Sequence, residues 1–316
     1  MNEIINLHRN WKLIKLRSKD HFKASVLIQH HALQFLAMAE KHLSARKKNN
    51  DDILLHWSLA KNMVVGGWLE AEQFPFRVGL SLDSLEIMLL KPPSVQVAKL
   101  NMQGKTKEEV FEWLDNQLYK IGVKYGRLSM DLLYSIPYHK TEEGIPFEIY
   151  SKDEMIELSS VRNNSELIFR YLYTFVDGCK PISISPVTFN STSVIPLELS
   201  NNKKPEHLVN IGFAMPDSLI DHCYFYATLL NNHTQDISYE DIQQLNGEGY
   251  WIITDHLSAI LPLYKFYADN QKAKQIYRVL SFYVSALNNI FDMLLVPEYR
   301  LSRKELYGNK IFIFSE

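Results

Sequence analysis

Short segments in which apolar and polar side chains alternate constrain the fold of this chain more than any other feature. Segments 76–82, 207–213 and 222–229 each keep this alternation. A strand of this kind has one buried face and one wet face, which is typical of antiparallel sheets. Parallel sheets would instead need continuous apolar runs, each followed by a crossover helix. The alternation therefore predicts antiparallel β-sheet.

Helical periodicity marks four longer segments, at 20–42, 106–122, 151–178 and 270–296. The clearest helix start is at Thr106 and Glu109, which have the spacing of a capping box. Together, the two kinds of periodicity predict an α+β fold, with antiparallel β-sheet(s) covered by about four α-helices.

The chain has no internal repeat and no low-complexity tract. Its polar breaks, at 47–52, 200–206 and 231–236, are short enough to be surface loops rather than interdomain linkers. We therefore expect a single α+β unit over residues 1–316. It would carry a basic amphipathic segment at 1–24 and a C-terminal tail at 298–316. The basic segment is expected to pack on its own domain, the alternative being a membrane-surface or partner helix.

In one predicted strand, the positions of the apolar side chains shift by one residue, from one face to the other. Ile182 and Ile184 share one face, whereas Val187 and Phe189 have the other parity, and Pro186 lies at the switch. Proline lacks the amide that a ladder needs, so the pattern indicates a bulge or an edge strand.

Charge and cysteine usage exclude several classes of protein. The formal net charge is −2, so nucleic acid is not an expected partner. Cys179 and Cys223 form no CxxC pair, which fits a reducing compartment and gives no support to a dithiol or metal motif. No window approaches the about 18 uncharged apolar residues of a membrane span, and the N-terminus has no apolar run of a signal peptide. A cytoplasmic protein is the default expectation.

None of the common catalytic or phosphate-binding motifs GxxxxGK[ST], GxGxxG, HExxH and GxSxG occurs in the sequence. Gly104-Lys105-Thr106 resembles the end of a phosphate loop, but Lys99 stands where the upstream glycine is required. Among the eleven histidines, His30 falls near an apolar stripe and is expected to be a hydrogen-bonded core residue. We therefore expect no metal and no cofactor.

The segment 222–229 carries the nearest thing to a functional signal. Its apolar face is ordinary core, whereas its other face is a row of large side chains with polar tips. Such a face suits the wall of a ligand pocket or a wet interface. A second polar pair, Asp255 and His256, follows the predicted strand at 250–254. The predicted ligand-binding residues are His222, Tyr224, Tyr226, Asp255 and His256, completed by Tyr138 and His139 from a loop.

Three functions remain open from these residues. The first is a protein that binds a small molecule or peptide in a polar-aromatic pocket. The second is an enzyme that uses the same histidine, aspartate and tyrosine side chains for acid-base or metal chemistry. It would require at least two of His139, His222 and His256 to lie together beside a carboxylate in a cleft. The third is an assembly subunit, such as a homo-oligomer, in which the apolar helix end at 290–296 and the tail at 311–314 cover a neighbouring chain.

Several short motifs along the chain are similar to the motifs of a known protein family. They are His30-His31-Ala32-Leu33-Gln34, Gly104-Lys105-Thr106, Trp113-Leu114, Tyr134-Ser135-Ile136-Pro137-Tyr138-His139, the strand at 181–189, Ile211-Gly212-Phe213, Pro216-Asp217, Tyr224-Phe225-Tyr226, Gly249-Tyr250-Trp251 and Leu261-Pro262. With these motifs, residues 25–290 resemble a bacterial family catalogued only as a domain of unknown function. Family members tend to carry Ser-Pro-Gly-Asp where this chain has Ala214-Met215-Pro216-Asp217, which puts the turn there in doubt.

The resemblance brings no activity with it. It implies one continuous unit rather than two separable modules. It also implies that the 134–139 loop and the 216–226 segment belong to a shared architecture.

Overall fold

The computed structural model describes residues 2–15, 19–45, 53–176, 178–197, 207–230, 242–296 and 301. It divides the chain into two compact units that alternate along the sequence. The first unit contains residues 1–15, 164–182 and 192–316, and the second contains 16–163 and 183–191. Neither unit is one continuous stretch. The single unit expected over residues 1–316 stays a prediction.

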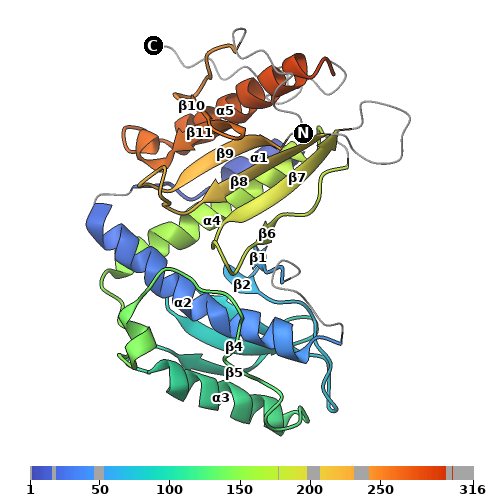
Figure 1. Ribbon diagram of the computed structural model, residues 1–316, viewed down its shortest axis with the longest axis vertical. Helices are drawn as coiled ribbons and strands as arrows, with labels where there is room; N and C mark the ends of the chain where they lie inside the picture. The colour runs from blue at the N-terminus through green and yellow to red at the C-terminus, as the bar shows by residue number, and fades with distance from the viewer. Residues whose placement is uncertain are drawn as a thin grey trace. The chain divides into compact units, whose positions relative to one another are not determined.

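Antiparallel sheets accompanied by α-helices occur in both units, which confirms the predicted α+β class (Figure 1). In the second unit the sheet is a meander of five strands in the order β1-β2-β3-β4-β5. The strands are β1 (His56–Ser58), β2 (Met63–Val65), β3 (Arg77–Ser81), β4 (Glu86–Lys91) and β5 (Val95–Asn101). Strand β3 lies within the predicted alternating segment at 76–82, and its pairing with β4 places Gly79 opposite Met88.

The helices of the second unit are α2 (Lys19–Leu43), α3 (Lys107–Lys120) and the first part of α4 (Lys152–Leu172). Helix α2 packs against β3, and α3 lies next to β5 (Figure 1). The predicted capping box is present: Thr106 Oγ1 accepts from the Glu109 amide at 3.2 Å, and Glu109 accepts from the Thr106 amide at 2.9 Å. The predicted ends of α2 and α3 lie within two residues of the observed ones, as expected for ends that fray, whereas α4 ends at Leu172, six residues before the predicted 178.

The frame-shifting segment contains an edge strand, as predicted, but this strand is shorter than the predicted one. Only β6 (Ser183–Ile184) is extended; a turn follows, and Phe189 takes a left-handed φ of 60°. The Pro186 carbonyl accepts from His30 Nε2 at 2.9 Å and from Gln34 Nε2 at 3.0 Å, both on α2. Two side-chain donors thus satisfy a carbonyl that a strand would have paired. The same bond confirms His30 as a hydrogen-bonded core residue.

In the first unit the sheet runs β10-β11-β9-β8-β7. The strands are β7 (Ser191–Leu197), β8 (His207–Ala214), β9 (Tyr224–Leu230), β10 (Tyr250–Ile253) and β11 (Leu257–Pro262). Helix α5 (Lys272–Met293) packs against β9 and β11 (Figure 1). The predicted inward residues of β8, Val209, Ile211 and Phe213, are fully buried.

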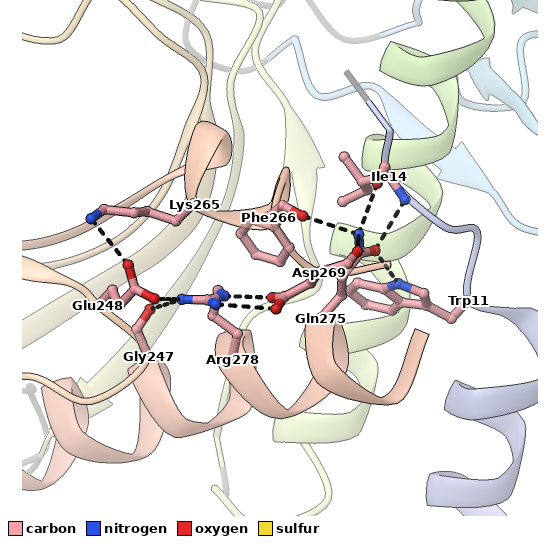
Figure 2. A network of polar contacts seen from close by, with 9 residues as sticks. All are labelled: Trp11, Ile14, Gly247, Glu248, Lys265, Phe266, Asp269, Gln275 and Arg278. Carbon is pink, nitrogen blue, oxygen red and sulfur yellow. Dashed lines mark hydrogen bonds and ion pairs between the residues drawn. The ribbon is translucent and has the colours of Figure 1, made fainter. Parts of the chain in front are cut away.

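Residues 2–15 of the predicted N-terminal segment pack on the first unit, whereas residues 19–24 begin α2 of the second unit. Helix α1 (Asn2–Asn10) leads to Trp11 and Ile14, which are both buried. The side-chain amide of Gln275 accepts from Trp11 Nε1 at 3.1 Å and from the Ile14 amide at 3.0 Å, and it donates to the Ile14 carbonyl at 2.8 Å (Figure 2). A buried amide on α5 therefore fixes the backbone of this segment.

The predicted tail at 298–316 lies outside the described residues except for Leu301, and so does its strand-like part at 311–314. None of the helices in the described part of the chain has the length and apolarity that crossing a bilayer requires.

Candidate functional site

Strand β9 has the two unlike faces that the sequence predicts, although it begins at Tyr224 rather than at His222. Cys223, Phe225, Ala227 and Leu229 are all buried. The Phe225 ring lies 6.3 Å from that of Tyr283 on α5 and 5.8 Å from that of Phe266. This face is ordinary core, and only the other face can take part in a site.

Part of the polar face is already occupied by contacts within the sheet. Tyr226 lies over its cross-strand partner Gly212, where a side chain would collide with the tyrosine ring. The Tyr226 hydroxyl is hydrogen-bonded to Thr192 Oγ1 at 2.7 Å, and burial raises the pKa of Tyr226 to about 12. The structure therefore places Tyr226 in packing, against its prediction as a ligand-site residue.

The polar face opens at the start of β9. The Tyr224 hydroxyl donates to Asp217 Oδ2 at 2.6 Å. Asp217 Oδ1 in turn accepts from the amides of Leu219 and Ile220, at 2.8 and 2.9 Å. These bonds form an Asx-type turn in the loop between β8 and β9. Burial, together with the bond to Asp217, holds the pKa of Tyr224 well above its ordinary value.

A hollow of about 380 Å³ lies beside this turn, and we call it the β9 hollow. The β8–β9 loop, the first residue of β10 and the short 3-10 helix η4 (Leu263–Phe266) supply its walls. Its lining residues are Asp217, Ser218, Leu219, Ile220, Asp221, His222, Tyr250 and Tyr264. Tyr224 does not line the β9 hollow but supports it through Asp217.

His222 joins two walls of the β9 hollow. Its ring packs edge-on against Tyr264, with ring centroids 4.9 Å apart. Its Nε2 atom lies 3.1 Å from Asp221 Oδ1. A partner on each side limits the orientations of this imidazole. His222 is the predicted candidate whose surroundings agree best with a role in binding.

Figure 2 shows a charged network that includes Lys265, the residue after the lining residue Tyr264. Arg278 on α5 makes two bonds to Asp269, at 2.7 and 3.2 Å, and one to Glu248 at 2.5 Å. Lys265 completes the network by pairing with Glu248 at 3.1 Å. Since Lys265 directly follows Tyr264 in η4, the network anchors the backbone that presents this tyrosine.

Asp255 and His256 do not join this site. They are exposed, in the turn between β10 and β11. That turn adjoins Leu257, which pairs with Leu229, whereas the β9 hollow lies at the other end of β9, near Tyr224. Five residues of strand separate the two ends of this pairing, which is about 17 Å. Sequence alone did not show which end of the sheet the turn would occupy.

Tyr138 and His139 belong to the second unit. Tyr138 is exposed and donates to Glu143 at 2.6 Å. His139 is buried, and its Nδ1 atom accepts from the Thr141 amide at 3.3 Å. Its ring centroid is 5.3 Å from that of His31. Both residues have local structural partners.

The part of the chain that the structure describes holds no group of three or more histidine, cysteine, aspartate or glutamate side chains placed to bind a metal ion. Residues absent from the predicted ligand set line the β9 hollow: Asp217, Asp221, Tyr250 and Tyr264. A signal existed for the aspartates, which flank the turn before β9. Tyr264 carried no signal, because its place depends on the pairing of Pro262 with Tyr224.

Comparisons with protein-family models, with curated proteins and with solved structures give no match to this chain. The resemblance to a bacterial family of unknown function therefore stays a prediction.

Proposed function

We propose that this protein binds a small molecule or a peptide in the β9 hollow. The observation that carries the proposal is the gathering of polar and aromatic side chains around one concavity. Tyr250 and Tyr264 come from separate elements, and His222 lies between the loop wall and Tyr264. Aromatic rings with polar tips give contact area and hydrogen bonds at the same place, which is what a binding site needs.

The dimensions of the β9 hollow support the proposal. Its volume of about 380 Å³ lies within the range of small-molecule sites, near the lower end. Its walls are braced before any ligand arrives, because Asp217 fixes the loop and the Arg278 network fixes η4. A braced site loses less conformational entropy when a ligand binds.

Two alternatives have less support. An enzyme using several histidines of the first unit would need them together, but His256 lies at the far end of β9 from His222. An assembly subunit would use the apolar end of α5, but Ile290, Phe291 and Val296 are buried within the chain itself. Binding in the β9 hollow is the function that the described contacts favour.

We also propose a cytoplasmic location. Neither Cys179 nor Cys223 is joined in a disulfide, and thiols persist most readily in a reducing compartment.

A screen of neutral, anionic and cationic fragments by ligand-observed NMR tests the proposal. Fragments that bind the wild-type protein should bind Tyr264→Leu about fivefold or more weakly, because the substitution removes one aromatic wall. Tyr267→Leu is the matched control, since Tyr267 is exposed, lies three residues away and does not line the β9 hollow. Fragments that bind both variants equally well, or no fragments at all, would contradict the proposal.

A further inference from the structure

The charges around the β9 hollow say which class of ligand it takes. Two carboxylates line it, from Asp217 and Asp221. The eight lining residues, all described, include no lysine or arginine. The remaining titratable cation is His222, which is held against Asp221. An anionic ligand would therefore meet two negative groups and no fixed positive one.

Lys265, which directly follows the lining residue Tyr264, already has a carboxylate partner. Lys265 Nζ lies 5.6 Å from the ring centroid of Tyr264, but its ammonium pairs with Glu248 at 3.1 Å. Glu248 also receives Arg278, so this charge network is balanced within itself. The charge of Lys265 is therefore already matched by Glu248.

The aromatic walls favour the same class of ligand. Tyr250 and Tyr264 line the β9 hollow, and the faces of aromatic rings attract cations. A carboxylate and a ring face acting together bind an ammonium group better than either alone, because one supplies charge and the other supplies a surface that needs little desolvation.

We infer that the β9 hollow takes a ligand with a cationic nitrogen, either an alkylamine or a quaternary ammonium group. This inference rests on the proposed binding function and names its ligand class. Asp217 and Asp221 supply the negative charge. Asp221 is the one to substitute in a test, because Asp217 holds the β8–β9 loop through bonds from Tyr224 and from the amides of Leu219 and Ile220. The tyrosine rings form the apolar part of the site.

Matched probes that differ in charge but not in shape test the inference by isothermal titration calorimetry. Choline is compared with its neutral isostere 3,3-dimethylbutan-1-ol, and n-butylamine with n-butanol. We expect at least one cation to bind about fivefold or more tightly than its neutral partner. Asp221→Asn should weaken binding of that cation by about fivefold.

Asp255→Asn is the control for net charge. Asp255 is an exposed carboxylate of the same unit at the opposite end of β9, so its substitution should leave cation binding unchanged. Binding weakened equally by both variants would reduce the effect to long-range attraction and overturn the inference.

The remaining outcomes separate the inference from the function on which it rests. If each neutral probe binds as tightly as its cation, the β9 hollow is a binding site but the cationic preference is wrong. If no cation binds while neutral or anionic fragments still distinguish Tyr264→Leu from Tyr267→Leu, the cationic preference is again wrong. If neither probes nor fragments bind, both proposals fail.

Discussion

At the scale of single residues, hydrogen bonds of equal length can contribute very different amounts to the stability of the fold. Tyr224 donates to Asp217 and Tyr138 donates to Glu143, both at 2.6 Å. Tyr224 is half-buried, whereas Tyr138 is largely exposed. Water replaces a lost partner easily at an exposed site and poorly at a buried one.

Substitution Tyr224→Phe should therefore reduce the free energy of unfolding by about 1.5 kcal/mol, because a charge-assisted bond to Asp217 is lost. Tyr138→Phe should produce no measurable change. Urea unfolding of both variants at neutral pH measures the difference. Equal effects of the two substitutions would contradict the assignment of Tyr224 as a support of the β9 hollow.

Two adjacent histidines predict a pH dependence of stability for the second unit. Burial lowers the pKa of His30 and of His31 from 6.5 to about 4. The carbonyls of Pro186 and Pro137 accept from their Nε2 atoms, which suits the neutral rings. At a pH below the pKa that these histidines have in the unfolded chain, the unfolded chain binds protons that the native state does not. Stability should therefore fall as the pH drops from about 6.5 to about 4, by about 3 kcal/mol for each histidine.

The test is the urea midpoint measured across this pH range. His30→Gln keeps a neutral N–H donor but does not titrate, so its stability should fall less steeply with acid. His56→Gln, at an exposed position of the same unit, should keep the wild-type slope. A wild-type midpoint that stays constant between pH 6.5 and 4 would show that these imidazoles are not held neutral.

At the scale of elements, local signals were sufficient where one turn of chain decides the structure. The capping box of α3 is an example, since both of its bonds join residues three apart.

Thr106→Ala should cost about 1 kcal/mol of unfolding free energy. Glu112→Ala, on an exposed position of the same helix, is the control for loss of side-chain contacts. A cost no larger than that of the control would contradict the capping role.

Local signals failed where distant groups decide the structure. Segment 185–189 has strand-like parity, but the carbonyl of Pro186 is captured by side chains of α2, more than a hundred residues away in sequence. The candidate site likewise has one feature that local sequence predicts and another that depends on distant groups. Alternation predicted the two faces of β9, but the contact of His222 with Tyr264 depends on how β9 and β11 are paired.

The attachment of the N-terminal segment to α5 depends on Gln275, whose whole side chain is buried and hydrogen-bonded. Gln275→Leu would leave Trp11 Nε1 and the Ile14 backbone without buried partners, at a cost of about 3 kcal/mol. Hydrogen exchange at the Ile14 amide should accelerate in this variant. Lys274→Ala, at the adjacent exposed position, should leave that amide protected. Unchanged protection in Gln275→Leu would show that other contacts hold the segment.

At the scale of the whole molecule, the order of the segments predicts how the chain can be divided. The first unit needs residues 164–182, which come before the second unit is complete at 191. Within it, Phe169 on α4 packs against Tyr283 on α5, with ring centroids 5.7 Å apart. A fragment of residues 192–316 lacks this helix and α1, so it should not unfold cooperatively by circular dichroism. A cooperative transition in the fragment would contradict this account of the core.

The central claim is that the β9 hollow is a binding site, and tyrosine ring NMR tests it most directly. Protein labelled with ¹³C in its tyrosine rings is titrated with the tightest fragment from the screen. We expect saturable shifts, with one common Kd, at Tyr224, Tyr250 and Tyr264, and none at the exposed Tyr119 and Tyr125. Shifts confined to other tyrosines, or none at saturating fragment, would contradict the claim.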